Sequence, residues 1–111
     1  MRTFSIPTKR PPTTPGEILQ EDFLKPLGLT QQQFAAALGI DRVRLNAILN
    51  GRRAVTADTA MRLAQVLGTS AELWLNLQMI CDLAAARHSP AASEIKKLKR
   101  IKTRDKQTVA G

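Results

Sequence analysis

The stretch TQQQFAAALGIDRVRLNAILN, residues 30–50, decides the fold. Thr30 and Asp41 are both good N-caps for a helix, and Gly39 can take the left-handed conformation that ends one. These signals predict helices over 31–38 and from 42 to about 49. Only Gly39 and Ile40 separate the end of the first helix from the cap of the second. A link this short forces the two helices to cross steeply.

The apolar residues of this stretch also fit a steep crossing. Ala35 lies one helical turn before Gly39, where two closely approaching helices need a small side chain. The remaining inward positions are Phe34, Leu38, Ile40, Leu45 and Ile48. This combination is typical of the helix-turn-helix that many DNA-binding proteins use. The alternative interpretation is an ordinary pair of helices inside a bundle.

Start and stop signals for three further helices flank this motif. Pro15 suits the first turn of a helix that ends near Pro26 and Gly28. Thr56 and Ser70 are N-caps for helices that run to the residue before Gly68 and to about Arg87. The chain has 111 residues, 43% of them hydrophobic and 4% aromatic, so its core must consist mainly of aliphatic residues. We therefore predict one all-α domain, a compact bundle of five helices.

The formal charge of +8 lies at the two ends of the chain. Residues 15–87 carry seven basic and seven acidic side chains, whereas 1–14 carry three basic ones and 88–111 carry seven basic against two acidic. Several prolines precede Thr13 and prevent a regular helix there. We expect a flexible basic arm at 1–14, a folded domain at 15–88 and a flexible basic tail at 89–111. Nucleic acid is one partner that suits this charge, and an acidic protein or an anionic membrane surface would also satisfy it.

If 42–49 is the recognition helix, its first turns enter the major groove of DNA. Arginine can pair with guanine and asparagine with adenine, while small apolar side chains touch thymine methyl groups. The predicted base-contacting residues are Gln31, Arg42, Val43, Asn46 and Ala47. The predicted contacts to the DNA backbone are Thr30, Gln32, Arg44, Asn50, Arg52 and Arg53. The alternative is that these arginines form a solvated helix face and a solubilising loop.

The last predicted helix has two apolar stripes. One broad stripe faces the core, whereas Leu75, Met79 and Leu83, spaced by four, form a second. A domain of this size covers one stripe, so we expect the second to form a homodimer interface. The alternative is that the first helix and the N-terminal arm cover both stripes. In the tail, Ile95, Leu98 and Ile101 recur every three residues, which is consistent with a short helix capped by Ser93.

Candidates for chemistry are few. Cys81 lies among apolar residues and is expected to be a packed thiol, and His88 has no second metal ligand beside it. We therefore predict no enzyme activity, no metal site and no cofactor. A single cysteine, no secretory signal and no apolar run long enough to span a bilayer predict a cytoplasmic protein without membrane contact.

Two longer stretches are more specific than a helix-turn-helix alone. PGEILQEDFLKPLGLTQQQFAAALGI (15–40) and ILNGRRAVTADTAMRLAQVLGTSAELWLNLQ (48–78), with the following DL, resemble the HigA-type antitoxin branch of the phage-repressor-like, or XRE-type, helix-turn-helix family. The resemblance runs from about Pro12 to Leu83. It implies a compact five-helix, lambda-repressor-like fold in a dimer that binds operator DNA in its own promoter. It also implies neutralisation of a HigB-like, mRNA-cleaving toxin.

Three hypotheses for function follow. The first is an autoregulating antitoxin of a type II toxin-antitoxin pair. The second is a free-standing helix-turn-helix repressor without a toxin partner. The third is a protein-interaction module that uses the last helix and the tail and does not bind DNA.

Overall fold

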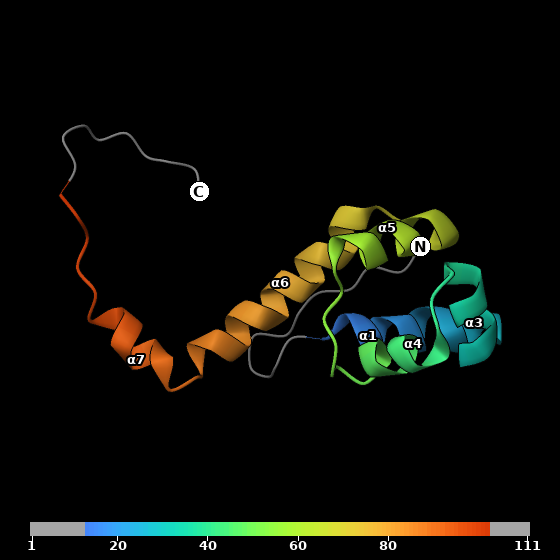
Figure 1. Ribbon diagram of the computed structural model, residues 1–111, viewed down its shortest axis with the longest axis horizontal. Helices are drawn as coiled ribbons and strands as arrows, with labels where there is room; N and C mark the ends of the chain where they lie inside the picture. The colour runs from blue at the N-terminus through green and yellow to red at the C-terminus, as the bar shows by residue number, and fades with distance from the viewer. Residues whose placement is uncertain (1–12, 103–111) are drawn as a thin grey trace.

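The computed structural model describes residues 13–102, and these form helices and connecting loops without a strand (Figure 1). The first helix consists of α1 (Pro15–Ile18), the π-helical segment η1 (Leu19–Leu24) and α2 (Lys25–Leu27). The other helices are α3 (Gln31–Leu38), α4 (Arg42–Leu49), α5 (Ala57–Leu67), α6 (Ala71–Arg87) and α7 (Ala91–Lys96). The all-α fold predicted from the sequence is confirmed. Within the described residues no helix combines the length and the apolar composition that crossing a membrane requires.

The predicted caps begin the helices. The side chains of Thr30, Asp41, Thr56 and Ser70 each accept a hydrogen bond from the backbone N–H three residues later. Thr14, which the sequence analysis assigned to the arm, does the same for α1, and Glu17 bonds back to the Thr14 N–H. Side-chain caps therefore satisfy part of the unpaired N–H groups at five helix starts.

The first helix continues past Pro26 and ends at Gly28, which has a φ of 66°. The N–H of Lys25 donates to the carbonyl of Gln20, five residues back, and this wide spacing defines η1. Pro26, which has no N–H to donate, follows this widened segment directly. The helix therefore passes through the proline and stops two residues later, at Gly28.

The core lies between α1, α3, α4, α5 and α6. Trp74 and Phe34 are its largest fully buried side chains, and the ring of Phe23 packs 5.8 Å from that of Trp74, centroid to centroid. The other buried apolar residues are Ile18, Leu19, Leu24, Ala35, Leu38, Leu45, Ile48, Leu49, Val55, Ala60, Leu63 and Leu77. Every inward position predicted for the helix-turn-helix is buried or packed against this cluster.

Gly16 marks the closest approach between two helices. A Cβ atom built on Gly16 would lie 2.5 Å from the carbonyl oxygens of both Ile48 and Leu49. These atoms belong to the C-terminal end of α4, so α1 lies directly against that end (Figure 1). The close approach predicted at Ala35, which is indeed buried, is therefore accompanied by a second one at Gly16 that no sequence signal indicated.

Helix α6 extends out of the bundle and leads to α7 at its far end (Figure 1). On α6, Met79 and Leu83 are 51% and 44% exposed, whereas Leu75 packs partly against the core. The tail contains a short helix, but not the one predicted: α7 begins at Ala91, after Pro90, and ends at Lys96, so Leu98 and Ile101 lie beyond it and Ser93 does not cap it. Ser93 lies inside α7 and its hydroxyl donates to the Pro90 carbonyl at 3.3 Å. Residues 1–12 of the predicted arm and 103–111 of the predicted tail lie outside the described residues.

Candidate DNA-binding interface

The turn between α3 and α4 has the sharp geometry predicted for a helix-turn-helix. Gly39 has a φ of 71°, and its N–H donates to the Ala36 carbonyl at 3.2 Å. The N–H of Ile40 then donates to the Ala35 carbonyl at 3.1 Å, which closes the end of α3. Asp41 starts α4 at once, with its carboxylate 2.9 Å from the Arg44 N–H. The two helices are therefore separate and cross.

The outer face of α4 carries the residues predicted to read bases. Arg42 is exposed and Val43 is 78% exposed, while Asn46 and Ala47 are half-buried one turn later. Positions three and four apart share one helix face, so these four side chains form one surface. Gln31, at the start of α3, joins it through a hydrogen bond with Asn46. The structure brings all five residues together.

Asn46 is the centre of a polar network on this face. Its Nδ2 donates to Gln31 Oε1 at 3.1 Å. Its Oδ1 accepts from Asn50 Nδ2 and from Arg52 Nη2, both at 3.1 Å. Asn50 Nδ2 also donates to the Asn46 backbone carbonyl at 3.0 Å. The network links α3, α4 and the loop that follows α4.

Most residues predicted to contact the DNA backbone lie at the border of this face. The exposed ones are Thr30, Gln32, Asn50, Arg52 and Arg53. Thr30 and Gln32 lie at the N-terminal end of α3, and the other three follow α4. Backbone N–H groups at a helix start and arginine side chains are both suited to bind phosphate.

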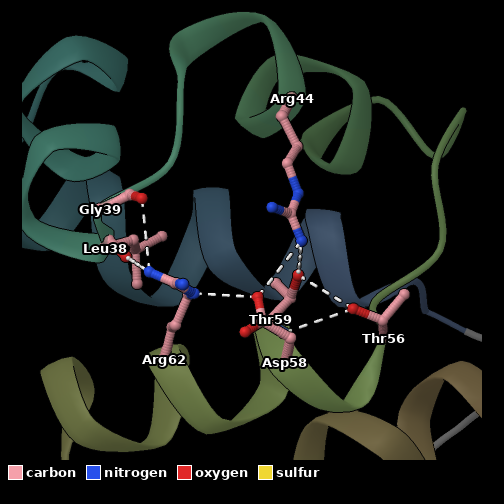
Figure 2. A network of polar contacts seen from close by, with 7 residues as sticks. All are labelled: Leu38, Gly39, Arg44, Thr56, Asp58, Thr59 and Arg62. Carbon is pink, nitrogen blue, oxygen red and sulfur yellow. Dashed lines mark hydrogen bonds and ion pairs between the residues drawn. The ribbon is translucent and has the colours of Figure 1, made fainter.

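Arg44 is placed differently from the other predicted contacts. Its Nη2 donates to Thr59 Oγ1 at 2.9 Å and lies 3.5 Å from Asp58 Oδ2 (Figure 2). Only 28% of its side chain is exposed. Because it points towards α5, Arg44 is separated from the surface that carries Arg42 and Val43.

A second arginine holds the turn of the motif to α5, and the sequence analysis missed it. Arg62 Nη1 donates to the carbonyls of Leu38 and Gly39 at 3.0 and 3.3 Å (Figure 2). Its Nε donates to Asp58 Oδ2 at 2.9 Å. The carbonyls at a helix C-terminus have no partner within the helix, so Arg62 caps α3 from another element. The spacing of four between Asp58 and Arg62 on one helix could have predicted their ion pair, but nothing in the sequence predicts the contact of Arg62 with α3.

Asp58 is the acidic member of this network. The hydrogen bond from Arg62 lowers the pKa of the Asp58 carboxyl below its ordinary value of 3.8, although partial desolvation opposes this. The positive charges of Arg62 and Arg44 lower this pKa further. Asp58 is therefore ionised at neutral pH and balances positive charge within the domain. The arginines that remain on the interface are Arg42, Arg52 and Arg53.

The part of the chain described by the structure holds no group of three or more His, Cys, Asp or Glu residues suited to a metal ion. Cys81 is half-buried, and its thiol lies 3.5 Å from the Thr13 carbonyl. Burial raises the pKa of this thiol, and the negative charges of Asp82 and Glu17 raise it further. A protonated, packed thiol agrees with the structural role predicted for Cys81.

Comparison with known proteins gives a consistent assignment. A family model described as "Helix-turn-helix" matches residues 21–74. Virulence-associated protein I of Dichelobacter nodosus is 42% identical over 95 residues, which cover 83% of this chain and 88% of that protein. Antitoxin HigA-1 of Vibrio cholerae is 41% identical over 81 residues, which cover 73% and 76%.

The solved structures include the Pseudomonas aeruginosa antitoxin HigA with the higBA promoter. It superposes with a TM-score of 0.75 at 33% identity, covering 81% of this chain and 97% of that chain. The match thus includes the helix-turn-helix and the helices that support it. This chain therefore belongs to the phage-repressor-like helix-turn-helix family of DNA-binding proteins, in the branch that contains the HigA antitoxins, and is not an enzyme.

Proposed function

We propose that this protein is the antitoxin of a type II toxin-antitoxin pair, and that it represses its own operon by binding operator DNA as a dimer. The observation that carries the proposal is the similarity, over 81% of this chain, to an antitoxin solved with promoter DNA. The exposed face of α4 supports it, since Arg42 and Val43 project from the helix that enters the major groove in this kind of motif. In this proposal the protein binds its operator in the cytoplasm, the location predicted from the sequence.

In this proposal the predicted contacts divide by chemistry. Arg42, Val43 and Ala47 contact base edges, with Gln31 at the border of the groove. Thr30, Gln32, Asn50, Arg52 and Arg53 contact the sugar-phosphate backbone and set the register. Arg44 is left out of the DNA contacts, because its guanidinium is bonded to α5.

Footprinting and gel shifts with DNA from upstream of the gene test the DNA contacts. Arg42→Ala should cost about 1 to 3 kcal/mol of binding free energy and relax the preference at one base pair. Arg53→Ala should weaken binding to all DNA sequences alike. Arg87→Ala is the matched control, because it removes the same charge from the exposed end of α6. Equal weakening by Arg42→Ala on every sequence would contradict its base-reading role.

The dimer is proposed to form through α6. Met79 and Leu83 are large, apolar and exposed, and Leu75 continues their stripe towards the core. Two-fold pairing through such a stripe puts two recognition helices in reach of successive half-sites about 34 Å apart. Met79→Glu combined with Leu83→Glu should yield a monomer in sedimentation experiments and reduce operator affinity. A dimer that survives both changes would exclude this surface.

The toxin partner is proposed from the family. Co-expression of the chain with the neighbouring open reading frame should relieve growth arrest caused by that second protein alone. Operator binding without such a toxin would favour the free-standing repressor. Absence of sequence-dependent DNA binding would favour the protein-interaction module instead.

A further inference from the structure

The Asn46 network has a fixed polarity, because Arg52 can only donate hydrogen bonds. Arg52 Nη2 lies 3.1 Å from Asn46 Oδ1, so the oxygen of this amide must face the loop after α4. Asn50 gives the same result, since its Nδ2 is held as a donor by the Asn46 backbone carbonyl. The nitrogen of the Asn46 amide must therefore face α3.

Gln31 is oriented in turn by Asn46. Asn46 Nδ2 donates to Gln31 Oε1 at 3.1 Å, so the oxygen of the Gln31 amide points into the network. The Gln31 Nε2 group then keeps its N–H donors for an outside partner. Because Arg52 can only donate, it fixes the orientation of the Asn46 amide on α4, and Asn46 in turn fixes the orientation of the Gln31 amide at the start of α3.

Asn46 itself is poorly placed to read a base. An asparagine that pairs with adenine uses its oxygen and its nitrogen together. Both lone pairs of Asn46 Oδ1 are already occupied by Asn50 and Arg52. The residue is also half-buried, unlike its neighbours Arg42 and Val43. This argues against the base contact predicted for Asn46 from the sequence.

We propose that Asn46 is a positioning residue, which holds Gln31 so that its amide presents donors to DNA and holds Arg52 beside it. The inference rests on the operator binding proposed above and refines it. The groups that such a surface recognises are hydrogen-bond acceptors, namely guanine O6, the N7 of either purine, thymine O4 or phosphate oxygens. Adenine N7 can also accept such a bond, but the N6 amine of adenine needs an acceptor from the protein, so this pair does not hold adenine through both atoms.

A double-mutant cycle tests the proposal on the full chain. In the otherwise unchanged protein, Gln31→Ala should weaken operator binding about threefold to tenfold, the value of one hydrogen bond at an interface. In the Asn46→Ala background the same change should cost less than about twofold, because Gln31 is no longer oriented. Gln65 is an exposed glutamine on α5 outside this network, so Gln65→Ala is the matched control. It should leave operator affinity unchanged both in the otherwise unchanged protein and in the Asn46→Ala background.

Asn46→Asp gives a second, more conservative test. The carboxylate still accepts from Arg52 and Asn50, but it offers no donor to Gln31. Gln31 must then turn its nitrogen inward and present its oxygen to DNA. In the Asn46→Asp background, Gln31→Ala should therefore no longer weaken operator binding, although Arg52 is still bonded to residue 46. Thermal unfolding of each variant identifies any loss of affinity that comes from a loss of folding.

The outcomes are separable. Equal effects of Gln31→Ala with and without Asn46 would overturn the proposal, and lost discrimination at one base pair in Asn46→Ala alone would identify Asn46 as a direct base reader. The network is also testable without DNA, because the Asn46 side-chain amide signal in heteronuclear NMR should shift on Gln31→Ala. If the NMR signal shifts but the protein does not bind operator DNA, the proposed function is contradicted while the hydrogen-bond network is supported. An unshifted NMR signal would contradict the hydrogen bond between Asn46 and Gln31, and with it the proposal.

Discussion

Replacing Gly16 by alanine tests whether the contact between α1 and α4 limits the stability of the domain. The new Cβ would lie 2.5 Å from two carbonyl oxygens and 2.8 Å from the Leu49 carbonyl carbon. All three are backbone atoms of α4, so no side chain can rotate to relieve the clash. One of the two helices must move instead, by about 1 Å, if ordinary contacts near 3.5 Å are to be restored.

The magnitude follows from two opposing effects. Overpacking of a tight site costs about 1 to 3 kcal/mol, and a rigid backbone neighbour favours the upper end. Alanine is better than glycine inside a helix by up to about 1 kcal/mol, but Gly16 lies in the first turn, where less of this is gained. We expect a net loss of about 2 kcal/mol, which is a fall in Tm of roughly 8 to 16 °C for a domain of this size.

Urea and thermal unfolding followed by circular dichroism measure this loss. Gly28→Ala is the matched control, because Gly28 has a φ of 66° and no atom within 4 Å of an added Cβ. That change introduces only the strain of a left-handed alanine, about 1 kcal/mol. A Gly16→Ala protein as stable as the unchanged chain, or more stable than the Gly28→Ala control, would refute the packing argument.

Three further outcomes concern other contacts. Arg62→Ala removes the cap on the last carbonyls of α3 and should destabilise the domain by about 1 kcal/mol, discounted for its partial exposure, while the exposed Arg87→Ala should have little effect in the same unfolding assay. Because the folded pKa of Asp58 lies below its unfolded value, the stability that it contributes is complete above about pH 4 and is lost as the pH falls through the folded pKa. Asp58→Asn should therefore flatten the acid side of a stability–pH curve, and an unchanged curve would argue against the pair. At neutral pH, Cys81 should react with iodoacetamide more slowly in the folded protein than in urea, because burial raises its pKa; equal rates would show that the thiol is not protected.

Local signals in the sequence predicted most of the fold. The threonine, serine and aspartate caps and the glycines after them define helix ends through contacts three to five residues apart. The stretch Thr14–Glu17 carries such a signal too, since threonine followed three residues later by glutamate is the pattern of a capping box. The helix begins at Pro15 as predicted, and what was missed is that Thr14 caps it.

Contacts between distant residues could not be predicted in this way. Arg62 and Leu38 are 24 residues apart, and Asn46 and Gln31 are 15 apart. Their side chains meet only because α5 packs beside α3 and because α3 crosses α4 at the turn. Gly16 is a similar case, since nothing near it in the chain indicates that α4 ends against it. A sequence pattern identifies which residues face the same way on one helix, but not which atoms they meet on the next.

Arg42 and Arg44 show where this limit affects the proposed function. Both lie in the first turn of α4, and the sequence predicted a DNA contact for each, to a base for Arg42 and to the DNA backbone for Arg44. Two residues correspond to about 200° of helix rotation, so their side chains leave the helix on nearly opposite sides. Arg42 is exposed, whereas Arg44 donates to Thr59 and lies beside Asp58. The positive charge available to DNA is therefore smaller than the count of arginines indicates. Arg44→Ala should lower the stability of the domain, whereas the salt dependence of operator binding should stay nearly unchanged, because Arg44 contacts no phosphate in this proposal.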